Sequence, residues 1–285
     1  MDKKRLGYWR ERLMPPFLYP LDLKRWYKKC TGRRLNLKNP KTFSEKLQWL
    51  KLYYRNPKMS RYSDKYLVRK YVASQIGAEY LVPMLGLWNS FDEIDLDSLP
   101  NKFVLKATHG SKMNIIVEDK EHFDRADARK KMNQYLKTNF AFSFGYQLHY
   151  SPIRPRIIAE EYIENDGDLL DYKILAFHGK AAYIWIDSGR YTGHHRNIYD
   201  FDWKPAPFTI EFPKREEEFP RPENLEKMKE LAERLAKGFP AVRVDFYNQN
   251  GKILFGELTF TTGSGQEKIV PYRYDRILGD MMKLP

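Results

Sequence analysis

The stretch VRVDFYNQNGKILFGELTF, residues 242–260, decides the fold. Apolar and polar residues alternate on both sides of Asn250-Gly251, and an Asn-Gly pair between two such runs predicts a β-hairpin with a two-residue turn. Successive side chains of a strand point to opposite faces, so Arg243 and Asp245 share one face of the first strand. Asp245 and Glu257 lie at nearly equal separations from the turn, which predicts that their carboxylates lie close together across the ladder.

Asp245 and Glu257 therefore form a candidate metal site. Two carboxylates that face each other in an apolar sheet repel unless a cation lies between them, and Mg²⁺ prefers oxygen ligands and bridges to substrate phosphates. The alternative is a solvent-facing pair without a metal. Arg243 can stabilise the charge of a transferring phosphoryl group, and an ordinary surface ion pair is its competing explanation.

A lysine on a strand is the second chemical feature. FVLKATHG (103–110) and NIIVED (114–119) read as two strands joined by a short loop, with Lys106 just before that loop. A lysine beside a flexible loop can hold a polyphosphate, because the ammonium neutralises charge while loop N–H groups bond to oxygens. A snorkelling lysine beside a hairpin is the alternative.

An acidic strand end is the third feature. RIIAEEYIE (156–164) reads as a buried strand that ends at Glu160-Glu161. Exposed backbone groups there could bind an adenine edge, while a carboxylate takes the ribose or the exocyclic amine. An acidic strand end without a ligand is the alternative.

The remaining segments alternate between helical and strand patterns, which predicts an α+β enzyme with two lobes and a cleft. Thr42 or Ser44 can cap a helix that starts near residue 44, and Ser63 or Asp64 can cap the next. Further elements are expected at 124–138 and 223–239 (helices) and at 171–187 (a hairpin that turns at His178-Gly179).

Composition limits the class of protein. The 285 residues are 42% hydrophobic and 15% aromatic, which supports a sizeable core and argues against disorder. We expect no secretory signal in residues 1–20, which have no continuous apolar stretch, and no stretch of the sequence is long and apolar enough to span a bilayer. Because Cys30 is the single cysteine, we expect a reducing cytoplasmic setting, with contact at the inner face of the membrane as an option.

The net charge of +13 is concentrated at one end of the chain. Residues 1–70 carry 21 Lys and Arg against 5 Asp and Glu, an excess of +16. Interleaved Trp9, Trp26 and Trp49 make this segment suited to an anionic partner: nucleic acid, acidic lipid or acidic polysaccharide. A solvated basic surface over an aromatic core explains the same pattern.

Taken in order, these motifs resemble those of the ATP-grasp superfamily, and most closely its TupA-like group from bacterial cell-surface polysaccharide clusters. The resemblance covers about residues 40–270. It rests on DK…R (64–69), FVLKATHGS (103–111), IIAEEYIE (157–164), DYKIL (171–175), RNIYDFDW (196–203) and RVDF…GELTFTTGSG (243–265).

The resemblance implies ATP and Mg²⁺ as cofactors and assigns a role to each matching residue. Catalytic roles fall to Arg243 and Lys106, and metal ligation to Asp245, Glu257 and Thr259, which stands where many members have Asn. The implied nucleotide-binding residues are Lys65, Lys106, His109, Gly110 and Ser111 around the phosphates, Glu160, Glu161 and Ile163 at the adenine, Asp171 at the ribose, and Lys204 as a further phosphate contact.

The implied fold has two α+β lobes that clasp ATP. We expect a basic helical segment over 1–62, one lobe over 63–165 and a second lobe with the metal site over 166–285. The usual Rossmann-like N-terminal domain is not expected, because no strand, Gly-rich loop and helix occur in that order before residue 60. We expect the basic segment to take its place, so the resemblance says least about the acceptor.

The implied activity is carboxylate–amine ligation through an acyl phosphate. In the polysaccharide setting the carboxylate would belong to a uronic acid or acidic glycan, lipid-linked or free, and the amine to an amino acid. A kinase that phosphorylates a sugar hydroxyl is the main alternative, with His109 or His194-His195 as phosphate acceptors. A glycosyltransferase using Asp200 and Asp202 is another.

The non-enzyme alternative is a nucleic-acid-binding protein that uses residues 1–70. No zinc spacing or RNP-like motif accompanies the charge, so this hypothesis ranks behind the ligase.

Overall fold

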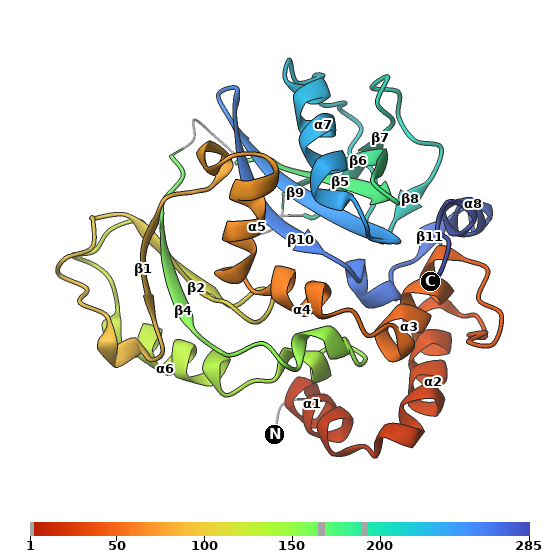
Figure 1. Ribbon diagram of the computed structural model, residues 1–285, viewed down its shortest axis with the longest axis horizontal. Coiled ribbons are helices and arrows are strands. Elements are labelled where there is room, and N and C mark those ends of the chain that lie inside the picture. The colour runs from red at the N-terminus through yellow and green to blue at the C-terminus, as the bar shows by residue number, and fades with distance from the viewer. Residues whose placement is uncertain (1–2, 165–168, 190–192) are drawn as a thin grey trace.

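The computed structural model describes residues 3–164, 169–189 and 193–285 (Figure 1). Its α-helices are α1 (Lys3–Leu13), α2 (Tyr19–Thr31), α3 (Phe43–Tyr53), α4 (Pro57–Ser63), α5 (Leu67–Gln75), α6 (Arg125–Leu136), α7 (Leu225–Ala236) and α8 (Arg273–Met281). Its strands are β1 (Met84–Trp88), β2 (Phe103–Ala107), β3 (Asn114–Val117), β4 (Ile157–Glu161), β5 (Asp171–Phe177), β6 (Lys180–Ser188), β7 (His195–Tyr199), β8 (Thr209–Ile210), β9 (Ala241–Gln249), β10 (Lys252–Thr259) and β11 (Ile269–Val270).

A four-stranded antiparallel sheet has the order β1-β4-β2-β3. Helix α6 packs Ala128 and Met132 against Phe103, Leu105 and their neighbours, because the alternation of β2 buries every second side chain on that face. The strands expected at 103–110 and 114–119 and the helix at 124–138 are confirmed. Strand β1 was missed, because the half-buried sequence MLGLW lacks a period of two.

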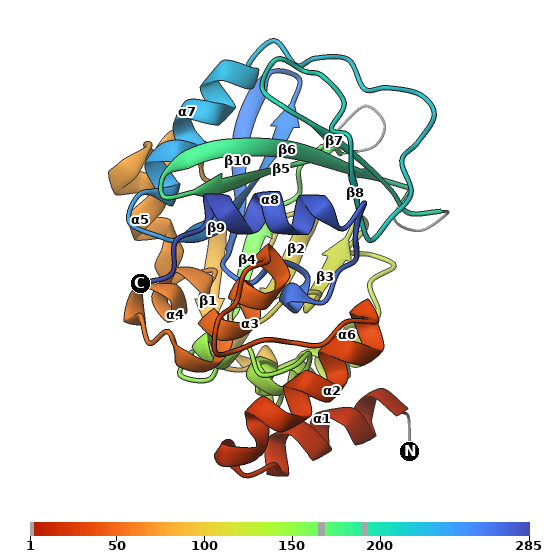
Figure 2. The ribbon, with the colours of Figure 1, turned by 90° about the vertical axis from the view of Figure 1, so that its right-hand side faces the viewer.

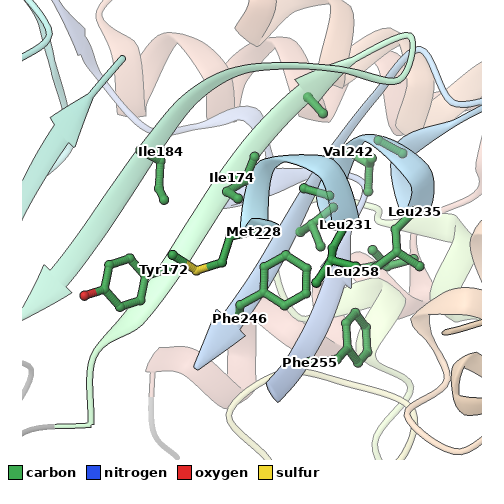
Figure 3. Close-up of a cluster of buried hydrophobic side chains, with 14 of the residues drawn as sticks. Tyr172, Ile174, Ile184, Met228, Leu231, Leu235, Val242, Phe246, Phe255 and Leu258 are labelled. Atoms are coloured by element: carbon green, nitrogen blue, oxygen red, sulfur yellow. The ribbon is translucent and has the colours of Figure 1, made fainter. Parts of the chain in front are cut away.

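A five-stranded antiparallel sheet has the order β10-β9-β5-β6-β7. Helix α7 covers one of its faces, where Met228, Leu231 and Leu235 pack against buried side chains of the strands, including Val244 and Phe246 (Figure 3). The opposite face of the same strands carries Arg243 and Asp245. The two faces of this sheet thus differ sharply in polarity, as the alternation in 242–260 predicts.

The β9–β10 hairpin has the turn that its sequence predicts. Asn250 and Gly251 have φ of 48° and 87°, the left-handed conformation that a two-residue primed turn requires. Phe255 pairs with Phe246 and Glu257 with Asp245, so Gly256 is an extra residue in a β-bulge. The bulge absorbs the one-residue difference in spacing and places Glu257 directly opposite Asp245.

The N-terminal segment is helical, as expected, and strand β1 is the first strand among the described residues. Thr42 and Glu45 form a capping box at the start of α3, which decides between the two candidate caps. Figure 2 shows α1 and α2 together at one end of the molecule, away from the strands. None of the helices in the described part of the chain combines the length and the apolar character needed to cross a membrane.

The α+β fold with a helical N-terminal segment is therefore confirmed. The boundaries proposed at 62/63 and 165/166 stay a prediction.

Candidate active site

A cavity that opens to solvent lies between the four-stranded sheet and the β9–β10 hairpin, with about 280 Å³ of empty space including its open mouth. Residues far apart in sequence meet here, because β2 and β4 form one wall and β10 forms the other. The cavity is lined by Lys65, Arg69, Leu81, Lys106, Glu160, Phe255 and Gly256.

The wall from the four-stranded sheet carries paired cations. Lys106 Nζ lies 2.6 Å from Glu160 Oε2, and Arg69 Nη1 lies 2.8 Å from Glu160 Oε1. One carboxylate thus orients two cations in a largely buried setting, which leaves an excess of positive charge facing the cavity. Such a surface suits an anionic group such as a polyphosphate.

Lys65 connects this wall to the hairpin. Its Nζ donates to the carbonyl of Gly110, and its backbone N–H donates to the carbonyl of Thr108 at 3.0 Å. Burial lowers the pKa of Lys65, while the negative charge of Glu257 opposes that shift. Lys65 therefore lies within electrostatic reach of both the 108–111 loop and the proposed metal carboxylate.

The 108–111 loop is held in position by contacts with the end of α6. His109 is buried, with Nε2 at 3.1 Å from the carbonyl oxygens of both Tyr135 and Thr138 at the end of α6. Burial lowers the pKa of His109 and favours the neutral ring. A Cβ on Gly110 would come within 2.9 Å of the Phe140 ring, so only glycine allows this close packing. The His109 side chain therefore fixes the position of the loop. Ser111, at the tip of the loop, is half-buried.

The hairpin carries a buried ionic cluster. Arg243 donates from Nε to Asp245 Oδ1 at 2.7 Å, and from Nη2 to Asp245 Oδ2 at 2.6 Å and Glu257 Oε1 at 2.9 Å. Its Nη1 donates to Thr262 Oγ1 at 3.0 Å. Thr259 Oγ1 donates to Glu257 Oε1 at 2.9 Å, so this threonine orients the carboxylate.

Strand β5 extends the cluster with two residues. Lys173 pairs with Asp171 and lies 4.0 Å from Asp245 Oδ2. Sequence reasoning gave Lys173 no role, although the spacing in DYK places it on the same strand face as Asp171. Thr262 and Arg69 were missed as well: Arg69 was quoted in the DK…R motif, but its pairing with Glu160 depends on a distant strand.

The two hairpin carboxylates differ in their pKa shifts. Burial acts to raise the pKa of Glu257, yet the charges of Arg243 and Lys65 lower it overall. Burial raises the pKa of Asp245 to about 6, and the charge of Asp171 adds to the shift, against the opposing effects of Arg243 and Lys173. A further cation would relieve this repulsion. Asp245 and Glu257 offer two oxygen donors, which fits Mg²⁺ held by one or two carboxylates together with substrate phosphates.

The same residues do not make a complete protein cage. Across residues 3–164, 169–189 and 193–285, no group of three or more His, Cys, Asp or Glu side chains is arranged to hold a metal ion. Phosphate oxygens and water would have to complete the coordination.

Seven of the ten predicted nucleotide-binding residues lie outside the cavity lining: His109, Gly110, Ser111, Glu161, Ile163, Asp171 and Lys204. Glu161 is exposed, and Ile163 follows the end of β4. Lys204 has a side chain that is 74% exposed and lies 3.5 Å from Asp202. It follows β7, three strands from β9, which corresponds to about 14 Å.

The Asp200–Asp202 motif forms a turn. Asp200 Oδ1 accepts from the backbone N–H groups of Asp202 at 3.0 Å and Lys204 at 2.9 Å. The Asp200 carboxylate thus caps a turn of its own backbone, which argues against a metal site for a nucleotide-sugar here.

Comparison with known proteins gives one family and several remote structural likenesses. Residues 45–283 match the family described as TupA-like ATPgrasp. Among curated proteins, no sequence matches.

Three solved structures illustrate the structural likeness. D-alanine–D-alanine ligase from Bacillus anthracis, complexed with ATP, has 14% identity and a TM-score of 0.46, with 78% of this chain and 63% of that chain covered. The ATP-grasp ligase PsnB complexed with minimal precursor has 12% identity and a TM-score of 0.43, with 73% of this chain and 55% of that chain covered. Phosphoribosylamine–glycine ligase from Thermotoga maritima has 10% identity and a TM-score of 0.43, with 71% of this chain and 48% of that chain covered.

This chain thus spans less than two thirds of the length of those enzymes. With identities and TM-scores this low, the assignment of the fold family rests on the sequence match over 45–283.

Proposed function

Because the chain belongs to the TupA-like ATPgrasp family, we propose that it uses ATP and Mg²⁺ to join a carboxylate to an amine. The observation that carries this proposal is the cavity lined by Lys65, Arg69 and Lys106, whose other wall, at Phe255 and Gly256, belongs to the hairpin that bears Asp245 and Glu257. Cations for phosphate thus line the cavity, and oxygen donors for a divalent metal lie on the hairpin that borders it.

The cationic wall supplies the phosphate contacts. Lys65 and Lys106 would neutralise phosphate oxygens. Glu160 holds Lys106 in place and, since it lines the cavity, remains a proposed nucleotide contact. The backbone beyond Glu160, at Glu161 and Ile163, remains the proposed adenine contact. Asp171 remains the proposed ribose contact, in competition with its ion pair to Lys173.

The hairpin supplies the metal ligands and the group that stabilises charge in the transition state. Asp245 and Glu257 would hold Mg²⁺, which neutralises the charge of the phosphates when bound. Arg243 is held by both carboxylates and by Thr262, so its guanidinium is already oriented before the substrate arrives. A preorganised cation of this kind stabilises charge as it develops on the transferred phosphoryl group.

The reaction needs no nucleophile from the protein. A carboxylate oxygen of the substrate attacks the γ-phosphorus of ATP, the bond to the β-phosphate oxygen breaks, and ADP leaves. The amine then attacks the acyl carbon, inorganic phosphate leaves, and the nitrogen loses a proton to give the amide. The contribution of the protein is alignment and charge neutralisation.

We further propose a uronic acid of a cell-surface polysaccharide as the carboxylate and an amino acid as the amine. The support is the TupA-like family and the basic N-terminal segment, whose excess of +16 over residues 1–70 suits an acidic glycan. The carboxylate–amine chemistry does not depend on this choice.

ADP release distinguishes the ligase from the kinase. Purified protein with Mg²⁺ and ATP would be screened against uronic acids paired with amino acids, with Glu257→Gln as the inactive control. We expect ADP and phosphate to accumulate only when both a carboxylate and an amine are present, with an amide product by mass spectrometry. ADP that appears with a neutral sugar and no amine, together with a phosphorylated sugar, would support the kinase instead.

A further inference from the structure

The α1–α2 hairpin exposes an unusual number of large apolar side chains. Helices α1 and α2 are joined through a short 3₁₀ helix, Pro16–Leu18, at one end of the molecule (Figure 2). The hairpin patch consists of Leu6, Trp9, Leu13, Phe17 and Leu21, which are 48%, 40%, 74%, 79% and 50% exposed. Scattered exposed apolar residues are ordinary, but a cluster within one short hairpin marks an interaction surface.

Helix α1 turns its apolar face outward. Leu6, Trp9 and Leu13 follow one another at helical spacing, so they share a face. The opposite side of α1 is attached by polar contacts: Glu11 is buried and its Oε2 accepts from the backbone N–H of Gly145 at 2.9 Å. This arrangement is the reverse of an ordinary surface helix, whose apolar face packs against the body.

Helix α2 adds positive charge next to the patch. Its inner face is buried through Leu23 and Tyr27, whereas Lys24 and Lys28 lie exposed at helical spacing from Leu21. Residues 1–70 as a whole carry the excess of +16.

Exposed apolar side chains with lysines on the adjacent helix fit an anionic bilayer surface, which offers both hydrocarbon and phosphate. A nucleic acid would leave the exposed Leu13 and Phe17 uncovered, and a second copy of the chain would bring two basic surfaces together. We propose that the α1–α2 hairpin docks the protein on membranes rich in anionic phospholipid, with Leu13 and Phe17 inserted among the headgroups. This proposal goes beyond the ligase proposal and does not depend on it.

Vesicle binding tests the proposal in the absence of ATP. The full-length protein would be sedimented with vesicles of phosphatidylcholine alone and of phosphatidylcholine with phosphatidylglycerol. We expect partitioning onto the anionic vesicles that weakens as salt is raised. Leu13→Ala/Phe17→Ala should reduce the partition coefficient about tenfold or more, and Lys24→Glu/Lys28→Glu about 30-fold or more.

Matched variants control for general effects. Ile277→Ala/Met281→Ala removes two apolar side chains that are 40% and 41% exposed on α8. Lys180→Glu/Lys237→Glu reverses two exposed charges at the β5–β6 turn. Both should bind vesicles like the parent protein, and circular dichroism should show that every variant is folded.

A folded parent protein that does not bind anionic vesicles would overturn the proposal, as would binding that the hairpin variants leave unchanged. Self-association or nucleic-acid binding through the same residues, without vesicle binding, would also contradict it and identify the other partner.

Discussion

The site has two walls: the cationic side of the cavity and, beside Phe255 and Gly256 on its other side, the ionic cluster of the hairpin. These two walls differ in how their charges balance. On the four-stranded sheet side, Lys65, Arg69 and Lys106 surround one acid, Glu160. On the five-stranded sheet side, the acids Asp171, Asp245 and Glu257 surround two cations, Arg243 and Lys173. One wall therefore has an excess of positive charge and the other an excess of negative charge, although both are largely buried.

This difference in charge indicates which ligand groups each wall can bind. Buried charges are costly unless they are paired, so an unbalanced cluster is stable only if a partner of opposite sign joins it. A polyphosphate would balance the first wall and a divalent cation the second. Mg²⁺ bound to nucleotide phosphates would balance the charge of both walls at once, which supports a ligand shared between them.

The largest expected effect is the loss of Arg243. In Arg243→Met, Asp245 and Glu257 lose the cation that bridges them, and the transferred phosphoryl group loses its oriented positive charge. We expect turnover, measured as ADP release, to fall about 10²–10³-fold. The Arg243→Lys variant keeps the charge but not the fork of donors, and should recover only part of the activity.

A destabilised fold could produce the same loss, because removing one partner of a buried ion pair costs about 3–5 kcal/mol. Thermal unfolding with and without Mg²⁺ separates the two effects. If folded Arg243→Met turns over like the parent, the negative wall is not the catalytic one.

The cationic wall is tested by Lys106→Met. We expect the affinity for Mg²⁺-ATP to fall about 10- to 100-fold, because a buried charge-assisted contact to phosphate is lost. Calorimetry measures the change directly. Lys102→Met is the matched control: this lysine precedes the same strand but pairs with the exposed Glu164, and its loss should leave affinity unchanged. If both variants lowered the affinity for Mg²⁺-ATP equally, the cationic wall would not be the phosphate-binding one.

A smaller effect is expected from Thr262, whose hydroxyl accepts a hydrogen bond from Arg243 on the negative wall. Thr262→Val removes the hydroxyl that accepts from Arg243 while keeping the shape of the side chain. A hydrogen bond to a charged group contributes about 1.5–3 kcal/mol, so turnover should fall about tenfold or more, with little change in ATP affinity. Thr262→Ser should retain parental turnover. A drop in affinity without a drop in turnover would place Thr262 on the nucleotide side instead.

The hairpin and its carboxylate pair could be predicted from the sequence, because they depend on local rules. Asn250-Gly251 fixes the turn, and the period of two fixes which residues share a face. The bulge at Gly256 was not foreseen, yet it explains why unequal spacings still bring Asp245 opposite Glu257.

The partners of Glu160 could not be predicted in this way. Glu160 meets Lys106 because β4 pairs with β2, and it meets Arg69 because a helix packs nearby; both are long-range contacts. Lys204 illustrates the opposite case, and its role as a phosphate contact stays a prediction. Its motif follows the family order, but its strand lies at the far edge of the sheet from β10.

The smallest effect is accordingly expected for Lys204→Ala. Since this exposed lysine lies 3.5 Å from Asp202 and outside the cavity lining, we expect less than about a twofold change in the affinity for Mg²⁺-ATP, as for other exposed ion pairs. A tenfold loss in a calorimetric titration would show that the loop after β7 moves to the nucleotide.

The central claim is that the two walls share Mg²⁺-ATP, and calorimetry on the parent protein and Glu257→Gln tests it most directly. Glu226→Gln, on the exposed face of α7, is the matched control. The account predicts nucleotide binding that strengthens with Mg²⁺ in the parent and the control, and a gain from Mg²⁺ that is largely lost in Glu257→Gln. A folded parent protein that binds no ATP with or without Mg²⁺, or a Glu257→Gln variant that keeps the full gain, would contradict it.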